Sequence, residues 1–237
     1  MGKQYIKQNI KAMIFDIDGT LYQQDKLHRL IFYKIARYFI TNPIDATEAI
    51  ISILSFRHAL EKMRSMNITN ESLRDKQLEI ASNICFFKIN IIKYHVTRWM
   101  EIEPSRLLHK VKYPYSDKFF CEAKLRGYKL AVLSDYPVNN KLEALGWKDV
   151  FDMQLSSQDL HINKLKPDPT GMNYIINCFG LNAEEVIYIG DRYEIDTKTA
   201  SNAGVGCVII GNNNDVNMDN RYIVMSYLDL YNEMKNV

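Results

Sequence analysis

The sequence predicts an α/β fold: a doubly wound parallel sheet with an all-helical segment inserted after its first strand. In the second half of the chain, short apolar runs alternate with helical patterns, which is typical of parallel strands covered by helices on both faces. A similar apolar run near the N-terminus is separated from them by about 90 residues of helical periodicity. With 237 residues, 47% of them hydrophobic, the chain can bury a sheet and a second, helical domain.

The first strand is the apolar run AMIF at 12–15, which Asp16 ends. The next segment, 23–112, shows apolar residues at helical spacing and no strand-like alternation. We therefore predict that residues 1–22 and 113–237 form the sheet domain, and that 23–112 form a helical cap domain.

Within the insertion, the apolar stripe of 27–40 predicts one helix. Asp45 and Glu48 are spaced as a capping box for a second helix over 46–66. Asn70 is a candidate cap for a long third helical region.

The rest of the sheet comes from apolar runs rich in Val, Ile, Leu and Tyr, at 129–135, 151–157, 186–191 and 205–211. Helical patterns lie between them, each followed by a glycine that can form a left-handed C-terminal cap, at 116–126, 137–145, 168–179 and 195–203. After a polar loop at 212–215 we expect one more short strand and a final helix.

Charge and cysteine content exclude several classes of function. The net charge of +2 gives no electrostatic reason to expect a nucleic acid or an anionic membrane as partner. No apolar run is long enough to span a membrane, and the polar start does not resemble a signal peptide. The four cysteines are far apart in the sequence, at Cys85, Cys121, Cys178 and Cys207. Scattered cysteines of this kind suit a reducing compartment, so we expect a cytoplasmic protein.

Polar side chains gather where the predicted strands end, which is where open parallel sheets bind ligands. Four acids, one hydroxyl and one lysine make up the set: Asp16, Asp18, Ser134, Lys166, Asp191 and Asp196. A hard cation held by carboxylates, with a lysine and a hydroxyl for the remaining phosphate oxygens, is what magnesium-dependent phosphoryl transfer requires. A carboxylate can also act as the nucleophile in such a site.

Four motifs carry a resemblance to a known family, and they occur in the family's order: DIDGTLY (16–22), VLSD (132–135), KPDP (166–169) and GDRYEID (190–196). The chain resembles the haloacid dehalogenase-like (HAD) superfamily of hydrolases, with a Rossmann-like core and a C1-type helical cap. The motifs cover the core, about two-thirds of the chain, and DxDGT is the most specific of them.

The resemblance implies a role for each residue. Asp16 would be the nucleophile, and Asp18 would protonate the leaving oxygen and then activate water. Ser134 and Lys166 would hold the phosphoryl group.

The resemblance also implies a Mg²⁺ site. The ligands would come from Asp16, the main-chain carbonyl of Asp18, and Asp191, while Asp196 would bind or support the metal or orient Lys166.

Simpler interpretations of these residues stay open at this point. Ser134 and Asp196 could each cap a helix, and Lys166 could be a loop lysine with Lys164 as a competitor for its role. We favour Lys166 because the family's lysine directly precedes proline. Arg192 and Tyr193 stand where many members of the family carry small residues. We therefore expect the side of the site that would hold the metal to be more crowded, or to contact the substrate.

The sequence therefore predicts a Mg²⁺-dependent phosphatase that hydrolyses a small phosphorylated metabolite through an aspartyl-phosphate, and that acts as a monomer or homodimer. The alternatives are a phosphomutase of the same family and a non-catalytic HAD-like module that binds a ligand or partner. The cap should decide the substrate, which the sequence alone does not identify.

Overall fold

Six parallel strands form one sheet in the part of the chain that the computed structural model describes, residues 6, 8–66, 68, 71–211 and 223–236. Their order across the sheet is β3-β2-β1-β4-β5-β6, and every neighbouring pair is parallel. The strands are β1 (Ala12–Phe15), β2 (Lys129–Ser134), β3 (Met153–Ser156), β4 (Val186–Gly190), β5 (Gly206–Ile210) and β6 (Ile223–Met225). This confirms the predicted doubly wound parallel sheet.

The strand order creates a switch point beside β1. The chain builds outward from β1 through β2 to β3, then returns to the other side of β1 and continues through β4, β5 and β6. At such a point the connections leave in opposite directions, which opens a crevice beyond the carboxyl ends of the strands. The crevice therefore lies where β1 and β4 end, at Asp16 and Asp191.

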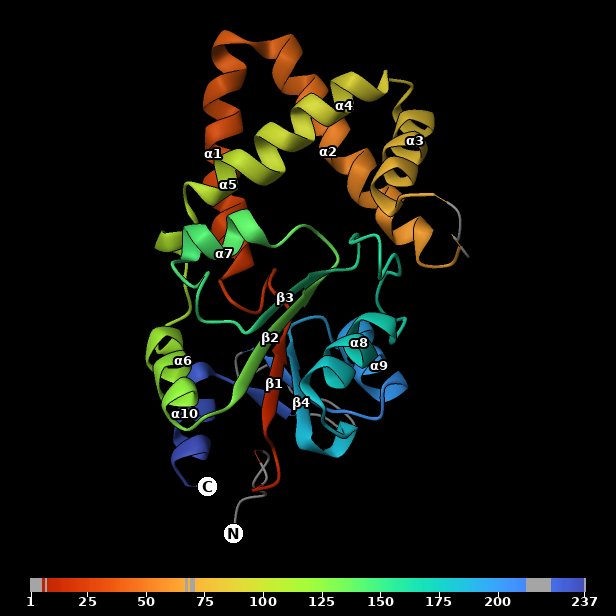
Figure 1. Cartoon of the computed structure of the whole chain (residues 1–237). Helices are drawn as coiled ribbons and strands as arrows, with labels where there is room; N and C mark the ends of the chain where they lie inside the picture. Colours follow the sequence, from red (N-terminus) through yellow and green to blue (C-terminus); the bar gives the residue numbers. More distant parts are fainter. Residues whose placement is uncertain (1–5, 7, 67, 69–70, 212–222, 237) are drawn as a thin grey trace.

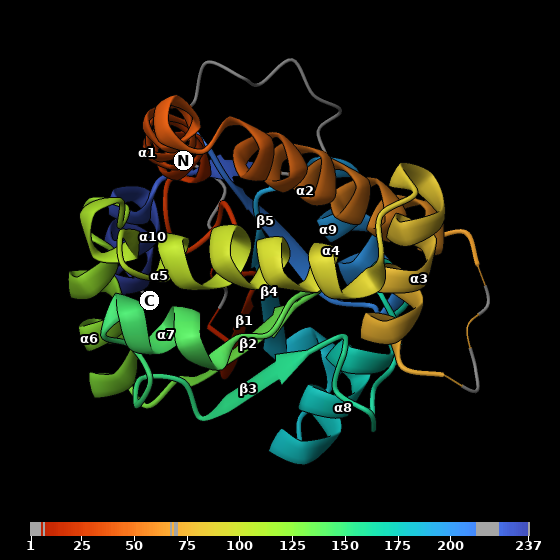
Figure 2. The same ribbon diagram turned by 90° about the horizontal axis from the view of Figure 1, so that it is seen from above.

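Helices cover both faces of the sheet (Figures 1 and 2). On one face lie α6 (Ser116–Leu125) and α10 (Tyr227–Lys235), and on the other α8 (Thr170–Phe179) and α9 (Tyr193–Asn202). The helix α7 (Asn139–Leu145) stands near the carboxyl end of β2, and the short η3 (Ala183–Glu185) leads into β4.

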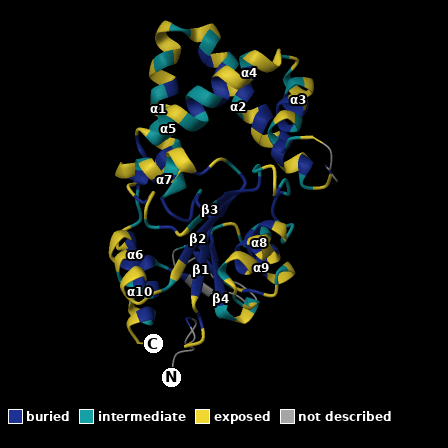
Figure 3. Cartoon of the chain, in the orientation of Figure 1, coloured by how far each residue is buried: buried dark blue, intermediate teal, exposed yellow. Residues whose placement is uncertain are grey.

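The strands are apolar on both sides because they are buried on both sides. In β1, Met13 and Phe15 join one core cluster, while Ala12 and Ile14 join the cluster on the opposite face. All four residues are inaccessible to solvent, and in Figure 3 the strands lie among the buried parts of the chain. Burial of both faces explains the continuous apolar runs that the sequence shows.

Among the described residues, the regular elements between β1 and α6 are all helices, and we call residues 23–112 the cap. It contains α1 (Gln24–Thr41), α2 (Pro43–Met63), α3 (Leu73–Cys85), α4 (Ile89–Val96), the π-helical turn η1 (Thr97–Ile102), α5 (Glu103–Ser105) and the 3₁₀ turn η2 (Leu108–Lys110). The cap stands over the carboxyl ends of the strands (Figure 1).

Two adjacent chain segments join the cap to the sheet domain. Tyr22 and Lys112 form an antiparallel bridge, and the backbone N–H of Gln23 donates to the carbonyl of Val111 at 2.8 Å. The entry and exit of the cap therefore run side by side.

Two details of the predicted cap helices are wrong. The second helix begins at Pro43 with Asn42 as its N-cap, so Asp45 lies in the first turn and does not cap the helix. Proline is favoured at the first helical position because its missing N–H would have no partner there. The predicted capping box of Asp45 and Glu48 does not form.

The predicted third helix is divided. It ends at Cys85 because Phe86 takes a left-handed conformation with φ of 60°, and α4 then begins at Ile89. Its N-cap is Ser72, whose side chain accepts from the N–H of Asp75. Asn70, the predicted cap, lies outside the described residues, as does the predicted loop at 212–215.

None of the helices in the described ranges combines the length and the hydropathy that crossing a bilayer requires.

Candidate active site

Asp16 lies at the carboxyl end of β1, at the switch point of the sheet. Its N–H donates to the carbonyl of Ile189 on β4 at 2.9 Å, which extends the sheet by one bond and fixes the residue. Its side chain is buried, and Oδ1 accepts from the Nζ of Lys166 at 2.9 Å. The predicted nucleophile and the predicted phosphate-binding lysine are therefore in direct contact.

Lys166 is buried and makes contacts with three side chains. Its Nζ donates to Asp16, to Oδ1 of Asp196 at 2.8 Å and to the hydroxyl of Tyr188 at 3.1 Å. Burial alone would lower the pKa of Lys166, but Asp16 and Asp196 outweigh it and hold the pKa well above its ordinary value. The lysine is therefore a fixed positive charge next to Asp16.

Asp196 uses both carboxylate oxygens within the protein. Oδ1 accepts from Lys166 and from the Tyr188 hydroxyl at 3.0 Å, and Oδ2 accepts from the N–H groups of Asp191 at 3.1 Å and Arg192 at 2.9 Å. Burial opposes ionisation, but Lys166 and these hydrogen bonds keep the pKa of Asp196 below its ordinary value. Asp196 thus ties the loop after β4 to Lys166.

Asp191 differs from Asp196 both in its hydrogen bonding and in the direction of its pKa shift. Its Oδ1 is buried and has no hydrogen-bond partner among the described residues. Burial, and then the charges of Asp16 and Asp196, raises the pKa of Asp191 to about 8. Burial likewise raises the pKa of Asp16 to about 7, against the pull of Lys166. One carboxylate oxygen from each of the three aspartates lies within 4.8 Å of the others.

Gly19 makes room for this cluster. Its φ is 88°, in the left-handed region, and a Cβ atom there would overlap the carboxylate of Asp191. The carbonyl of Gly19 accepts from the hydroxyl of Tyr113 at 2.9 Å, which holds the turn after β1. A side chain on residue 19 of the first motif would therefore overlap the Asp191 carboxylate.

Asp18 points to a different set of partners. The Nζ of Lys141, on α7, lies 2.6 Å from both of its carboxylate oxygens, and the hydroxyl of Tyr22 also donates to it. Burial would raise the pKa of Asp18, but Lys141 outweighs it and the pKa falls below its ordinary value. Lys141 was not predicted from the sequence, where its only signal is its place in the first turn of a helix that follows Ser134.

Ser134 ends β2 and is buried at the same edge. Its neighbour Asp135 is the last residue of the VLSD motif, but no role was predicted for it from the sequence. One Asp135 oxygen accepts from the N–H of Lys166 at 3.1 Å and from the hydroxyl of Ser157 at 3.0 Å, and the other accepts from Arg64 of the cap at 2.7 Å. Asp135 therefore joins two loops of the sheet domain to α2.

A cavity of about 760 Å³ lies between the cap and the sheet. Four of the predicted site residues line it: Asp16, Asp18, Ser134 and Lys166. Asp191 contacts this group through the cluster with Asp16 and Asp196.

The cap contributes Arg57 and His28 to the lining of the cavity. Arg57 of α2 contacts Nε2 of His28 on α1 at 2.9 Å. A guanidinium can only donate, so the imidazole accepts. Burial and the charge of Arg57 lower the pKa of His28, which favours its neutral form.

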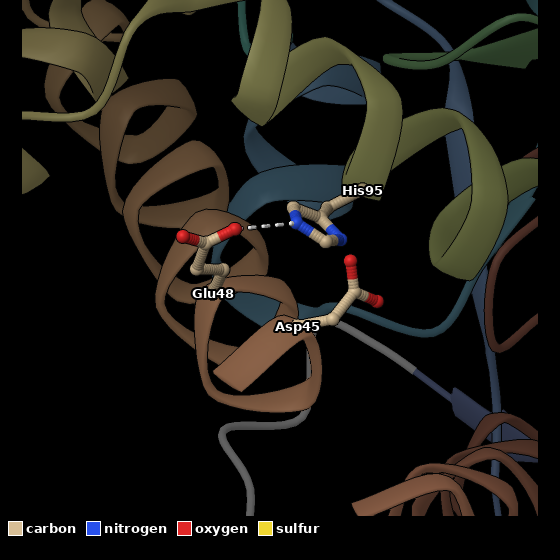
Figure 4. A group of neighbouring side chains, drawn as sticks. All are labelled: Asp45, Glu48 and His95. Carbon is tan, nitrogen blue, oxygen red and sulfur yellow. Dashed lines mark ion pairs between the residues drawn. The ribbon is translucent and has the colours of Figure 1, made fainter. Parts of the chain in front are cut away.

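A second group of acids and a histidine lies inside the cap and has a structural explanation. Figure 4 shows Asp45 and Glu48 of α2 facing His95 of α4. The His95 ring is buried, its Nε2 lies 3.6 Å from Glu48 Oε2, and the guanidinium of Arg98 lies 3.6 Å from Asp45 Oδ2. These contacts join α2 to α4, which carries His95, and to η1, which carries Arg98.

The chain is similar to known hydrolases and phosphatases. Residues 10–204 match the haloacid dehalogenase-like hydrolase family. Over 96% of this chain and 98% of the other, the chain is 28% identical to a glyceraldehyde 3-phosphate phosphatase of Methanocaldococcus jannaschii. It is 33% identical to a phosphoglycolate phosphatase of Pasteurella multocida over 43% of this chain and 44% of the other.

Among solved structures, the fold is similar to the HAD hydrolase YfnB of Bacillus subtilis, with a TM-score of 0.69 and 16% identity over 95% of this chain and 99% of that one. The structure combines a Rossmann-like sheet domain with a helical cap. The chain belongs to the haloacid dehalogenase-like hydrolase family.

Proposed function

We propose that this protein is a Mg²⁺-dependent phosphatase that hydrolyses a small phosphorylated metabolite through an aspartyl-phosphate on Asp16. One observation carries the proposal. The Asp16 carboxylate lines the cavity and lies 2.9 Å from a buried, positively charged lysine, beside a second carboxylate with an unpartnered oxygen. The phosphatases among its relatives support the reaction class.

Two groups are placed to hold the phosphoryl oxygens. Lys166 brings a positive charge that Tyr188 and Asp196 fix in position, and Ser134 brings a hydroxyl to the same edge of the cavity. Fixed donors of this kind stabilise the charge of a phosphoryl group in transit without reorganising during the reaction.

Asp16 and Asp18 would divide the chemistry. An oxygen of Asp16 attacks phosphorus, and the bond from phosphorus to the leaving oxygen breaks. Asp18, which Lys141 keeps ionised in this structure, takes up a proton from water when the substrate binds and supplies it to that oxygen. Asp18 then accepts a proton from the water that attacks the aspartyl-phosphate, which returns Asp16 to the carboxylate and releases phosphate. Lys141 and Tyr22 hold the Asp18 side chain beside the cavity for both steps.

The acids also fit a divalent cation. Asp191 presents a buried oxygen that no described group satisfies, and the pKa of Asp191 and of Asp16 is raised by burial and mutual repulsion. Oxygen ligands from Asp16, Asp191 and the main-chain carbonyl of Asp18 suit Mg²⁺. When bound, Mg²⁺ would offset the charge of the phosphate and of the carboxylates.

Asp196 plays a different part in this proposal. Because both of its oxygens already accept hydrogen bonds inside the protein, we place it behind the ligands, where it orients Lys166 and the loop that carries Asp191. We also retain residues 23–112 as the cap domain that closes over the substrate.

Phosphate release from p-nitrophenyl phosphate, with and without Mg²⁺, tests the proposal. Asp16→Asn should lower kcat by at least about a thousandfold, because it removes the nucleophile. Asp149→Asn, the same chemical change at an exposed acid, is the control and should be unaffected. Turnover that survives Asp16→Asn, or that ignores chelation of Mg²⁺, would contradict the mechanism.

A further inference from the structure

The cavity changes in polarity from one end to the other. At the sheet it is lined by Asp16, Asp18 and Lys166, and the next level of the cap contributes His28 and Arg57. Farther along the same two helices the lining is apolar: Ile31, Phe32 and Ile35 on α1, and Ile50, Ile53 and Leu54 on α2.

The helices place this apolar band at a defined distance from the phosphate end. His28 and Arg57 are in contact, so they mark the same level on α1 and α2. The apolar residues lie three to seven positions beyond that level on each helix. At 1.5 Å per residue, the band extends from about 5 Å to about 10 Å beyond the His28–Arg57 pair.

Two of these side chains are unusually exposed for their type. Phe32 is 67% exposed and Leu54 is 61% exposed, although both line a cavity. Apolar surface left open in a binding cavity is typical of a site that covers an apolar ligand.

Most charged groups of the cavity are already paired, which limits polar recognition. Arg74 pairs with Glu101 at 2.6 Å, Arg192 pairs with Glu61 at 3.0 Å, and Arg64 pairs with both Glu61 and Asp135. Arg57 contacts His28 at 2.9 Å, and both residues line the cavity together with Asp18.

We propose that the substrate is a phosphate monoester whose organic part is a hydrocarbon chain or ring, which packs against the apolar band of α1 and α2. This inference rests on the proposed phosphatase function and narrows the class of its substrate. Polar three-carbon esters would leave the band uncovered.

A homologous series of n-alkyl phosphates, from ethyl to octyl, tests the inference. The alcohols released have nearly the same acidity, so differences along the series report contact with the leaving group and not chemistry. Burial of one methylene contributes about a fourfold gain. We therefore expect kcat/KM to rise about two- to fourfold per methylene once the chain is long enough to reach the band, and to exceed the value for glycerol 3-phosphate at the long end of the series.

Substitutions in the band should remove this dependence on length. Phe32→Ser and Leu54→Ser should flatten the rise. Ile40→Ser, at a residue that is 80% exposed on α1 but does not line the cavity, is the matched control and should keep it.

Binding separates failure of this inference from failure of the proposed function. Calorimetry with n-alkyl phosphonates, in the presence of Mg²⁺, should show the same gain in affinity per methylene without any turnover. If no ester is hydrolysed but this gain appears, the phosphatase proposal fails and the apolar site stands. A flat or falling dependence on chain length in wild-type protein, in hydrolysis or in binding, would overturn the apolar site.

Discussion

At the residue scale, the first motif packs closely against Asp191 because residue 19 is a glycine without a side chain. Gly19 has a left-handed φ, and any Cβ there would meet the Asp191 carboxylate. The glycine of the DxDGT motif is therefore required by both backbone conformation and space. Its loss should affect the proposed metal site as well as folding.

We expect Gly19→Ala to lower the free energy of unfolding by about 2 kcal/mol or more, because a left-handed alanine alone costs about 1–2 kcal/mol and the overlap adds to this. Displacement of Asp191 should also weaken Mg²⁺ binding by at least about tenfold. Chemical denaturation and calorimetric titration with Mg²⁺ measure the two effects.

Gly180→Ala is the control for strain alone. Gly180 also has a left-handed φ, of 66°, but a Cβ there meets nothing within 4 Å. It should lose stability and keep its Mg²⁺ affinity. Equal loss of Mg²⁺ affinity in both variants would show that Gly19 does not act through Asp191.

At the scale of elements, Arg64 joins the end of α2 to two loops of the sheet domain. Its guanidinium pairs with Asp135 at 2.7 Å and Glu61 at 2.9 Å, and also donates to the carbonyl of Lys166. The Arg64 and Asp135 side chains are only 10% and 8% exposed. This connection brings the cap into contact with the loop that positions Lys166.

Arg64→Met should lower the free energy of unfolding by about 2–4 kcal/mol, because it leaves the largely buried Asp135 carboxylate without its cation. We also expect KM to rise, since the loop carrying Lys166 loses a contact. Thermal unfolding and steady-state kinetics provide the measurements.

The matched control is Arg126→Met on α6, where the pair with Glu122 is more exposed and is worth less than about 1 kcal/mol. If the two variants lost the same stability, the link between Arg64 and Asp135 would be no stronger than a surface ion pair.

At the scale of the whole molecule, the acid cluster couples stability to pH. In the unfolded chain an aspartate has an ordinary pKa of 3.8, whereas folding raises the pKa of Asp16 to about 7 and of Asp191 to about 8. At pH values between the unfolded pKa and the folded pKa, the folded protein holds protons that the unfolded chain has released. The contribution of these two groups to stability is therefore lost as the pH rises from about 4 to about 8.

We expect the metal-free protein to lose stability between pH 5 and pH 8 relative to Asp191→Asn, whose neutral side chain does not titrate. Mg²⁺ should raise the Tm of the wild-type protein more at pH 8 than at pH 5, because ligands that are already ionised bind the cation without releasing a proton. Scanning calorimetry across this range, with and without Mg²⁺, gives both quantities. A wild-type profile parallel to that of Asp191→Asn would contradict the raised pKa.

Most of the fold could be predicted from the sequence because buried parallel strands and amphipathic helices leave a local pattern of apolar residues. Glycines that end helices marked several boundaries, such as Gly146 and Gly180, both of which adopt a left-handed φ. The boundaries failed where local signals competed. The capping pattern at Asp45 predicted the wrong helix start, because the helix begins about one turn earlier, at Pro43. The helix break at Phe86 was not predicted, because no glycine marks it in the sequence.

The sequence by itself determined the α/β sheet, the helical insertion and the set of acids, serine and lysine at the strand ends, because strand direction and residue type are written locally. Only the tertiary structure decided their partners: Lys141 on Asp18, Tyr188 under Lys166, and Arg64 on Asp135. It also decided which apolar cap residues face the cavity. The members of each pair lie 22 to 123 residues apart along the chain, and periodicity reports that a side chain is buried without reporting which distant residue it meets.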